Sequence, residues 1–243
     1  MFVLIGHIFL NLVQIQKIMT IENNLNKICA SLPDGVTLVA VSKTKSNSQI
    51  MEAYAVGQRI FGENKVQELV RKWESLPKDI KWHFIGHLQT NKVRQIAPFI
   101  AMVHSVDSLK ILKTINDEAR LCQRVIPCLL QFHIASEETK FGFSLTEATE
   151  LLETIKFSEF QNVTICGVMG MASFTDDVTL IKKEFFTIHE IFQNLKDVFF
   201  RGNDNFREIS MGMSHDYLLA IENGSTMVRV GSDIFGERNL VTN

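Results

Sequence analysis

The sequence predicts an α/β protein built as a single (β/α)₈ barrel of the TIM type. About eight short apolar segments, rich in β-branched residues, alternate along the chain with amphipathic segments. This alternation is typical of a parallel sheet whose strands are joined by right-handed helical crossovers. The connections are short, and the length of 243 residues is close to the roughly 250 typical of one such barrel. The strand count favours a closed barrel over an open, doubly wound sheet.

The expected strands are short and strongly apolar, as buried parallel strands are. In the first of them, Val36 to Val41 is an almost unbroken apolar run that opens into the polar residues Ser42, Lys43 and Thr44. The eight expected strands are 36–43, 58–63, 80–86, 102–106, 126–134, 163–169, 206–211 and 227–231.

The segments between the strands have helical periodicity. In 65–76, Val66, Leu69, Val70 and Trp73 recur at helical spacing. The opposite face is expected to hold Lys65, Glu68, Arg71 and Lys72. The expected helices are 21–31, 46–56, 65–76, 90–99, 108–122, 145–156, 177–199 and 216–223.

The first eighteen residues do not fit this pattern. They are mostly apolar, but no basic residue precedes Lys17 and no small-residue cleavage site follows, unlike a secretory signal. The apolar run is also shorter than the roughly 20 residues of a membrane-spanning helix. Met19 and Thr20 suit a chain start and a helix cap. We expect an extra leader at 1–18, outside the fold, and one domain at 19–243.

The composition excludes several classes of partner. The chain has 25 Lys and Arg against 27 Asp and Glu, a formal net charge of −2, so no basic surplus favours nucleic acid. Its four cysteines form no Cys-x-x-Cys pair and have apolar neighbours, which indicates buried free thiols in a reducing compartment. We expect a cytoplasmic protein with no membrane partner.

The motifs of several common sites are absent from the sequence. No zinc-site spacing, phosphate-binding P-loop, dinucleotide fingerprint or Gly-x-Ser-x-Gly elbow is present. No metal is therefore expected. Glu63 and Asp107 are candidate paired carboxylates across the barrel mouth, although carboxylates at strand ends are frequently capping groups.

Lys43 is the first candidate functional residue, because function in such barrels lies at the carboxyl ends of the strands. It follows Val39-Ala-Val-Ser42, at the end of the first strand. A lysine at the rim of a barrel can act as an amine nucleophile and form a Schiff base with an aldehyde cofactor. Taken alone, a solvated strand terminus is the commoner explanation.

The last two strands add a candidate phosphate site. Barrels often bind phosphate between the loops after strands seven and eight, at a helix N-terminus. Ser214 and Ser232 supply hydroxyl donors there, and Gly231 lets backbone N–H groups approach an anion. Each fragment alone suits a cap or a turn. Together with Lys43 on the neighbouring first strand, they match the shape of pyridoxal 5′-phosphate, with its phosphate, ring and aldehyde.

These residues carry a family resemblance. The chain resembles the pyridoxal-phosphate homeostasis protein family, single-domain fold type III relatives of the alanine racemase N-terminal barrel. The match spans 20–239, and the leader at 1–18 departs from it. The matching stretches are 38–45, 61–64, 82–92, 104–107, 140–142, 210–214, 228–231 and 234–236.

The resemblance implies a role for each matching residue. Lys43 would hold pyridoxal 5′-phosphate as a Schiff base, and Arg229 would bond its pyridine nitrogen. Because arginine stays protonated, the ring would be a weaker electron sink than one paired with a carboxylate. Asn64 would lie near the ring or the lysine, and Ser210 belongs to the matching 210–214 motif. The implied phosphate-binding residues are Ser214, Gly231 and Ser232. Met169 and Met211 would face the mouth and contact the ring, although core packing is an equally good explanation for both methionines.

Racemisation would need a second acid/base on the opposite face of the ring. The racemases take a tyrosine from a second domain, for which this chain has no room. Tyr54 and Tyr217 both fall on predicted helices. The other candidate bases are His83, His87, His104, His133 and His215, several of which fit structural roles better.

Three functions therefore remain open. The favoured one is a non-catalytic pyridoxal phosphate-binding protein for intracellular homeostasis, buffering the cofactor or delivering it to apo-enzymes. The lack of the dimerising domain of the racemases favours a monomer. The alternatives are an amino-acid racemase of the alanine racemase type and a sugar-phosphate enzyme without this cofactor.

Overall fold

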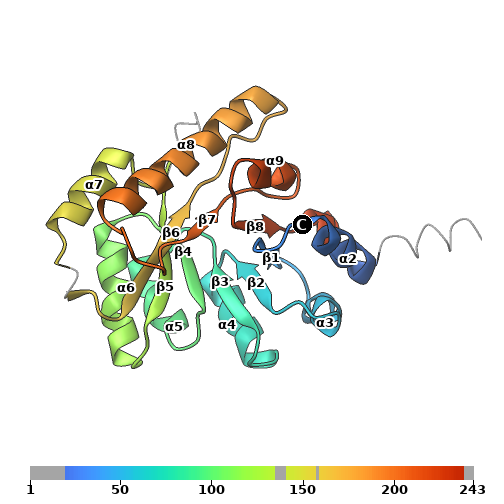
Figure 1. The fold of residues 1–243 in the computed structure, drawn as a ribbon. Coiled ribbons are helices and arrows are strands. Elements are labelled where there is room, and N and C mark those ends of the chain that lie inside the picture. The colour runs from blue at the N-terminus through green and yellow to red at the C-terminus, as the bar shows by residue number, and fades with distance from the viewer. Residues whose placement is uncertain (1–19, 135–140, 157–158, 238–243) are drawn as a thin grey trace, which may run out of the picture.

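The structure is a computed structural model that describes residues 20–134, 141–156 and 159–237. The expected leader at 1–18 lies outside the described residues. The described chain contains a closed barrel of eight parallel strands in sequence order, so the predicted (β/α)₈ fold is confirmed (Figure 1). The strands are β1 (Thr37–Val41), β2 (Ile60–Glu63), β3 (Lys81–Phe84), β4 (Met102–Val106), β5 (Ile126–Gln131), β6 (Val163–Met169), β7 (Glu208–Ser210) and β8 (Met227–Val230).

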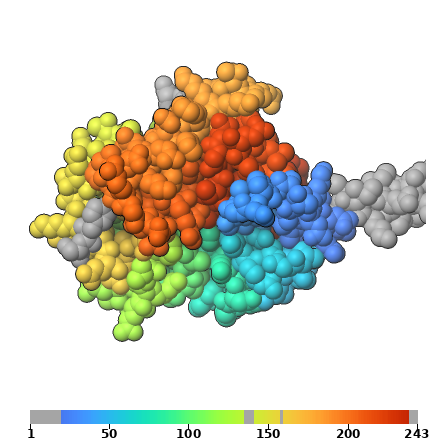
Figure 2. Space-filling view, viewed as in Figure 1, coloured from blue at the N-terminus to red at the C-terminus, as the bar shows by residue number. Residues whose placement is uncertain are grey.

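Helices connect the strands and cover the barrel. They are α2 (Ile21–Ser31), α3 (Asn47–Ala55), α4 (Val66–Ser75), α5 (Thr90–Ile96), α6 (Leu109–Leu121), α7 (Leu145–Thr154), α8 (Val178–Val198), α9 (Tyr217–Glu222) and α10 (Ser232–Phe235). In the space-filling view, α8 in orange lies against the red C-terminal segment (Figure 2). All the expected helices are present, and the four-residue α10 was not anticipated because it is too short to show periodicity.

Closure depends on the pairing of β1 with β8. Thr37 faces Met227 and Val39 faces Arg229 in a parallel register. This pairing brings the loop after β1 next to the loop after β8. In the same region, α2 packs against α10.

The core has an apolar outer layer and a partly polar interior. Large side chains such as Phe61, Trp82 and Phe185 are fully buried in the cluster that packs the helices on the barrel. The barrel interior, which is usually filled by Val, Ile and Leu, also holds the buried side chains of His104 and Arg229. This polar interior lies below the candidate site.

All four cysteines are free, as expected. The expectation that they are buried holds for Cys128 alone, since Cys29 is exposed and Cys122 and Cys166 are half-buried. Burial raises the pKa of the Cys128 thiol, which makes it a poor nucleophile. Within 20–134, 141–156 and 159–237, no helix combines the length and the apolar character that crossing a membrane requires.

Candidate functional site

Lys43 lies in a strained loop directly after β1. The Ser42 N–H donates to the Gly62 carbonyl of β2 at 3.0 Å, so the loop begins as a continuation of the sheet. Thr44 then adopts a φ of 66°. This left-handed conformation is costly for a β-branched residue and persists only where neighbours enforce it. Here the carboxylate of Glu68 accepts the Thr44 N–H at 2.7 Å. The backbone is therefore fixed at Ser42 and at Thr44, on either side of the half-buried Lys43.

A buried ionic network lies behind this loop. The expectation that Lys72 lies on the polar face of its helix is wrong, because Lys72 is buried within this network. Lys72 Nζ donates to the Ser42 carbonyl at 2.7 Å, to Glu63 Oε1 at 2.8 Å and to Glu68 Oε1 at 2.7 Å. Ser42 Oγ also donates to Glu63 Oε1 at 2.5 Å. Burial raises the pKa of Glu63, and Lys72 opposes this shift. The network makes one rigid unit of the β1 loop, the end of β2 and α4.

Glu63 is therefore not a catalytic partner of Asp107, and that hypothesis is wrong. The Glu63 side chain is fully buried among the groups of the network. Asp107 instead contacts His87, with Oδ2 to Nδ1 at 3.0 Å, and accepts a hydrogen bond from Ser108 Oγ at 3.2 Å.

Replacing Lys72 with methionine should lower the free energy of unfolding by about 3 kcal/mol, because it leaves a buried carboxylate without its cation. Urea unfolding followed by circular dichroism measures this loss. The control is Arg207→Met, which breaks the Arg207–Glu208 pair at 3.4 Å from a largely exposed arginine and should cost less than about 1 kcal/mol. Equal losses in the two variants would contradict the role given to the network.

The two loops expected to hold phosphate contact each other directly. The Gly231 N–H donates to Ser214 Oγ at 3.2 Å, which joins the loop after β8 to the loop after β7. Gly212 makes the first turn with a φ of 92°, and a Cβ there would lie 2.6 Å from the Ala220 Cβ. Ser232 is exposed at the first position of α10. Ser214, Gly231 and Ser232 are thus brought together, as expected.

Lys45 ties the phosphate loops to the loop that carries Lys43. Its Nζ donates to the carbonyls of Phe235, Gly236 and Glu237 at 3.2, 2.8 and 3.0 Å. An ammonium group is favourable at these carbonyls, at the C-terminal end of α10. The sequence does not predict this role, because nothing in it signals a contact between residues about 190 positions apart.

Arg229 projects into the barrel interior and is fixed by two hydrogen bonds. Nη1 donates to Ser210 Oγ at 2.6 Å and Nη2 donates to the Gly170 carbonyl at 3.0 Å. Burial lowers the pKa of Arg229 to about 10, an effect that nearby Asp216 opposes, so the guanidinium is charged at neutral pH. The structure therefore brings together Ser210 and Arg229, two of the expected site residues.

Two histidines extend this arrangement across the barrel. His104 Nδ1 lies 3.0 Å from Ser210 Oγ, and His104 Nε2 lies 2.9 Å from His83 Nδ1. Burial lowers the pKa of His83 to about 3 and that of His104 well below its usual range. Both rings are therefore neutral at physiological pH and are structural, as the sequence indicated.

These two histidines predict an acid-sensitive fold. The unfolded chain binds their protons near the ordinary pKa of 6.5, whereas the folded protein does not. Their contribution to stability is thus complete above pH 6.5 and is lost as the pH falls towards 3. Between pH 7 and pH 5, the depressed pKa of His83 should lower the free energy of unfolding by about 2 kcal/mol, and His104 should add to this loss. In urea titrations, His83→Gln should lose about 2 kcal/mol less than wild type over this interval, and equal losses would contradict the prediction.

The remaining candidate bases are placed elsewhere. Tyr217 Oη lies 3.1 Å from Ser31 Oγ of α2, and Tyr54 donates to Asp79 at 2.9 Å. Tyr54 lies on α3 and Tyr217 on α9, so both tyrosines are on helices, as expected. His87, His133 and His215 are exposed after β3, β5 and β7.

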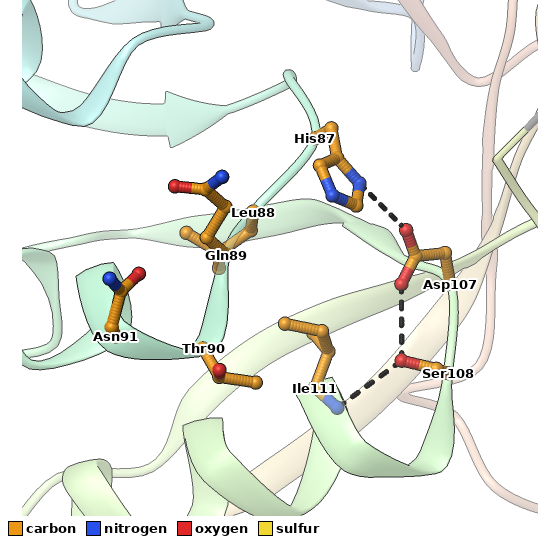
Figure 3. Close-up of a pocket in the computed structure, with 8 residues that line it drawn as sticks. All are labelled: His87, Leu88, Gln89, Thr90, Asn91, Asp107, Ser108 and Ile111. Atoms are coloured by element: carbon orange, nitrogen blue, oxygen red, sulfur yellow. Dashed lines mark hydrogen bonds and ion pairs between the residues drawn. The ribbon is translucent and has the colours of Figure 1, made fainter.

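An open pocket of about 320 Å³ lies beside His87, beyond the ends of β3 and β4 (Figure 3). Figure 3 shows the His87 ring pointing towards Asp107, with Ser108 next to it. This pocket is distinct from the loops that follow β1, β7 and β8. Among the described residues, no group of three or more His, Cys, Asp or Glu side chains is arranged to hold a metal ion.

The last three expected site residues differ in their placement. Asn64 is half-buried after β2, where Gly86 packs so closely that a Cβ would lie 2.4 Å from the Asn64 carbonyl oxygen. Met169 is buried on β6 in register with Ser210, on the interior side of the sheet. Met211 instead belongs to the hydrophobic core outside the interior. The expectation that Met211 faces the mouth is therefore wrong, since it follows Ser210 and points to the opposite side of the sheet.

Comparison with known proteins gives a consistent picture. Residues 17–239 match the family model described as the alanine racemase N-terminal domain. Pyridoxal phosphate homeostasis proteins are similar over most of the chain. The one from Vibrio alginolyticus is 39% identical over 216 residues, with 87% of this chain and 90% of the relative covered. The one from Homo sapiens is 38% identical, with 83% and 76% covered.

Solved structures agree with these relatives. PipY of Synechococcus elongatus PCC7942, in a structure with PLP bound, is 33% identical, with a TM-score of 0.82 and coverage of 89% of this chain and 100% of PipY. Alanine racemase from E. faecalis is 18% identical, with a TM-score of 0.66 and coverage of 90% and 58%, which shows a shared fold alone. The chain belongs to the pyridoxal phosphate homeostasis protein family, whose barrel is that of the alanine racemase N-terminal domain.

Proposed function

We propose that this protein binds pyridoxal 5′-phosphate covalently through Lys43 and holds it in reserve, without turning over an amino acid. The observation that carries the proposal is the joining of three loops at one edge of the barrel. Ser214 bonds Gly231, and Lys45 fastens α10 to the loop of Lys43. An anion site and a primary amine therefore share one rim.

The residues at this rim fit the cofactor. Because Ser214 Oγ accepts the Gly231 N–H, its own hydroxyl hydrogen is free to donate to a phosphate oxygen. A short helix after strand eight is a common element of phosphate sites in barrels, and α10 occupies that place. The charged Arg229 supplies a donor for the ring nitrogen. Asn64 follows β2, the neighbour of the strand that precedes Lys43. Bound pyridoxal phosphate supplies an aldehyde that condenses with a primary amine and releases water.

The family relatives support the choice of ligand. PipY has PLP in its solved structure, and relatives with 38–39% identity are pyridoxal phosphate homeostasis proteins. Conversion of an amino acid would need a second base beside the ring. Tyr217 is hydrogen-bonded to Ser31 and Tyr54 to Asp79, and His83 and His104 are buried and neutral. These placements favour holding the cofactor over racemisation.

The proposal extends to the setting in which the protein works. We propose a cytoplasmic monomer whose partners are pyridoxal phosphate and the apo-enzymes that receive it. The loops after β1, β7 and β8 all come from one chain, so the proposed cofactor site is built without a second copy.

Equilibrium dialysis tests the proposal. Purified protein should take up one equivalent of pyridoxal phosphate, and pyridoxal, which lacks the phosphate, should bind at least about tenfold more weakly because it misses the charge-assisted hydrogen bonds. Borohydride reduction followed by peptide mass spectrometry should place the modification on Lys43. No uptake, or modification spread over exposed lysines such as Lys27, would contradict the proposal.

A further inference from the structure

Four polar side chains form a continuous hydrogen-bonded chain through the barrel interior. The chain runs from His83 on β3 through His104 on β4 and Ser210 on β7 to Arg229 on β8, with contacts of 2.9, 3.0 and 2.6 Å. None of the four residues is more than 5% exposed. Arg229 continues the chain to the Gly170 carbonyl at the end of β6.

Packing alone does not explain these residues. Apolar side chains usually fill the interior of such a barrel, and a buried polar group is costly unless it is hydrogen-bonded. The interior of this barrel has apolar side chains as well, such as Val39 beside Arg229 in register. The polar chain therefore has a role that an apolar interior would not fulfil.

Arg229 determines which atom donates and which accepts in each hydrogen bond of this series. A guanidinium only donates, so Arg229 Nη1 donates to Ser210 Oγ. The Ser210 hydroxyl then donates to Nδ1 of His104, a neutral ring with one acceptor and one donor. His104 therefore carries its hydrogen on Nε2 and donates it to Nδ1 of His83.

The opposite direction leaves a buried group unpaired. If His104 carried its hydrogen on Nδ1, Ser210 Oγ would accept hydrogen bonds from both His104 and Arg229. The hydroxyl hydrogen of Ser210 would then have no acceptor among the contacts of the described residues. An unmade hydrogen bond in the interior costs about 1–3 kcal/mol. The Nε2–H form of His104 is therefore favoured.

We infer that His104 and Ser210 are positioning residues, which fix the guanidinium of Arg229 so that its remaining N–H groups meet the ring nitrogen of the cofactor. This inference rests on the proposed function. Two anchors, at Ser210 and Gly170, fix the plane of the guanidinium. The hydrogen-bonded side chains of His83, His104 and Ser210 are also neutral, so they do not cancel the charge of Arg229. The protein therefore presents a fixed cation to the ring nitrogen and disfavours its protonation.

The ligand-free protein provides the first test. In protein labelled with ¹⁵N histidine, NMR should show a neutral His104 protonated on Nε2 across neutral pH. Protonation on Nδ1 would reverse the chain and overturn the inference. Resonance assignment uses the His104→Gln variant, which removes that signal.

The loaded protein provides a sharper test with a matched pair of variants. Asparagine at position 104 keeps a polar atom near the place of Nδ1 and so keeps the contact with Ser210. Glutamine keeps a polar atom near the position of Nε2 and loses the contact with Ser210. Both variants remove the imidazole ring, so both lose the same packing contacts of that ring. The measured quantity is the ¹⁵N chemical shift of the labelled pyridine nitrogen in bound pyridoxal phosphate. The Arg229→Met variant gives the reference shift in the absence of the guanidinium donor.

The inference predicts a clear division between these variants. His104→Asn should keep the wild-type shift, while His104→Gln and Ser210→Ala should move most of the way to the Arg229→Met value. The latter two should also retain cofactor about tenfold less tightly, the equivalent of about 1.4 kcal/mol. Ser225→Ala removes a buried serine hydroxyl that bonds only backbone carbonyls near β7 and β8, and it should leave the shift unchanged.

The outcomes separate the inference from the proposed function. Identical shifts in His104→Gln, Ser210→Ala and wild type, with Arg229→Met displaced, would overturn the positioning role alone. If Arg229→Met also keeps the wild-type shift, Arg229 does not meet the ring nitrogen and the inference fails at its first step. No cofactor uptake by wild-type protein would overturn the proposed function and the inference together.

Discussion

Replacement of Lys43 with alanine is expected to abolish the covalent attachment of pyridoxal phosphate and to leave a weaker complex held through the phosphate. The covalent bond depends on one amine, whereas Ser214, Gly231 and Arg229 form their contacts independently of it. After borohydride reduction, intact-mass spectrometry should show the added mass of the cofactor in wild type and none in Lys43→Ala. Dialysis should still detect reversible binding by the variant.

Two controls accompany this experiment. Lys43→Arg keeps the positive charge at the rim but cannot form the same bond, so it should behave like the alanine variant. Lys27→Ala removes an exposed lysine of α2 and should retain the full adduct. An unchanged adduct in Lys43→Ala would show that another amine holds the cofactor and that the site is wrongly assigned.

Replacement of Gly231 with leucine is expected to weaken cofactor retention without removing the chemistry of Lys43. A Cβ at position 231 would lie 3.2 Å from the Val41 carbonyl oxygen and 3.3 Å from the Val41 Cβ, so a side chain pushes the β8 loop away from β1. The φ of −125° is open to any residue, and the effect is therefore steric. Overpacking of this kind costs about 1–3 kcal/mol, which corresponds to about tenfold to a hundredfold weaker binding.

The partner of Gly231 provides an independent check. Ser214→Ala removes the hydroxyl group and adds no bulk, so it should weaken retention by about tenfold through the loss of one hydrogen bond to a charged group. Dissociation constants from equilibrium dialysis of pyridoxal phosphate measure both effects. Wild-type affinity in Ser214→Ala would show that the loops after β7 and β8 do not hold the phosphate.

The barrel and its central residues were predictable from the sequence because their signals are local. Apolar runs such as 36–41 predicted strands, and helical spacing such as that of Leu69 and Trp73 predicted helices. Barrel closure then placed Lys43 next to Gly231, since the first and last strands must pair. The expected meeting of Ser214 and Gly231 followed from the same geometry.

The supports of the site were not predictable, because each depends on contacts between distant parts of the chain. Lys45 and Lys72 look like ordinary polar residues in the sequence, yet one fastens α10 and the other is the buried cation behind Lys43. Met211 was misplaced because the sequence does not show which side of β7 faces the interior. The chain from His83 to Arg229 likewise joins four separate strands.

The most direct measurement for the central claim is the exchange of the α-proton of amino acids. Protein loaded with pyridoxal phosphate is incubated with a panel of amino acids in heavy water, and the Cα–H signal is followed by NMR. We expect no exchange beyond that of a Lys43→Ala control, because the proposed site provides no second base beside the ring. Exchange that depends on Lys43 would show that the protein removes the α-proton and is an enzyme, and would contradict the account.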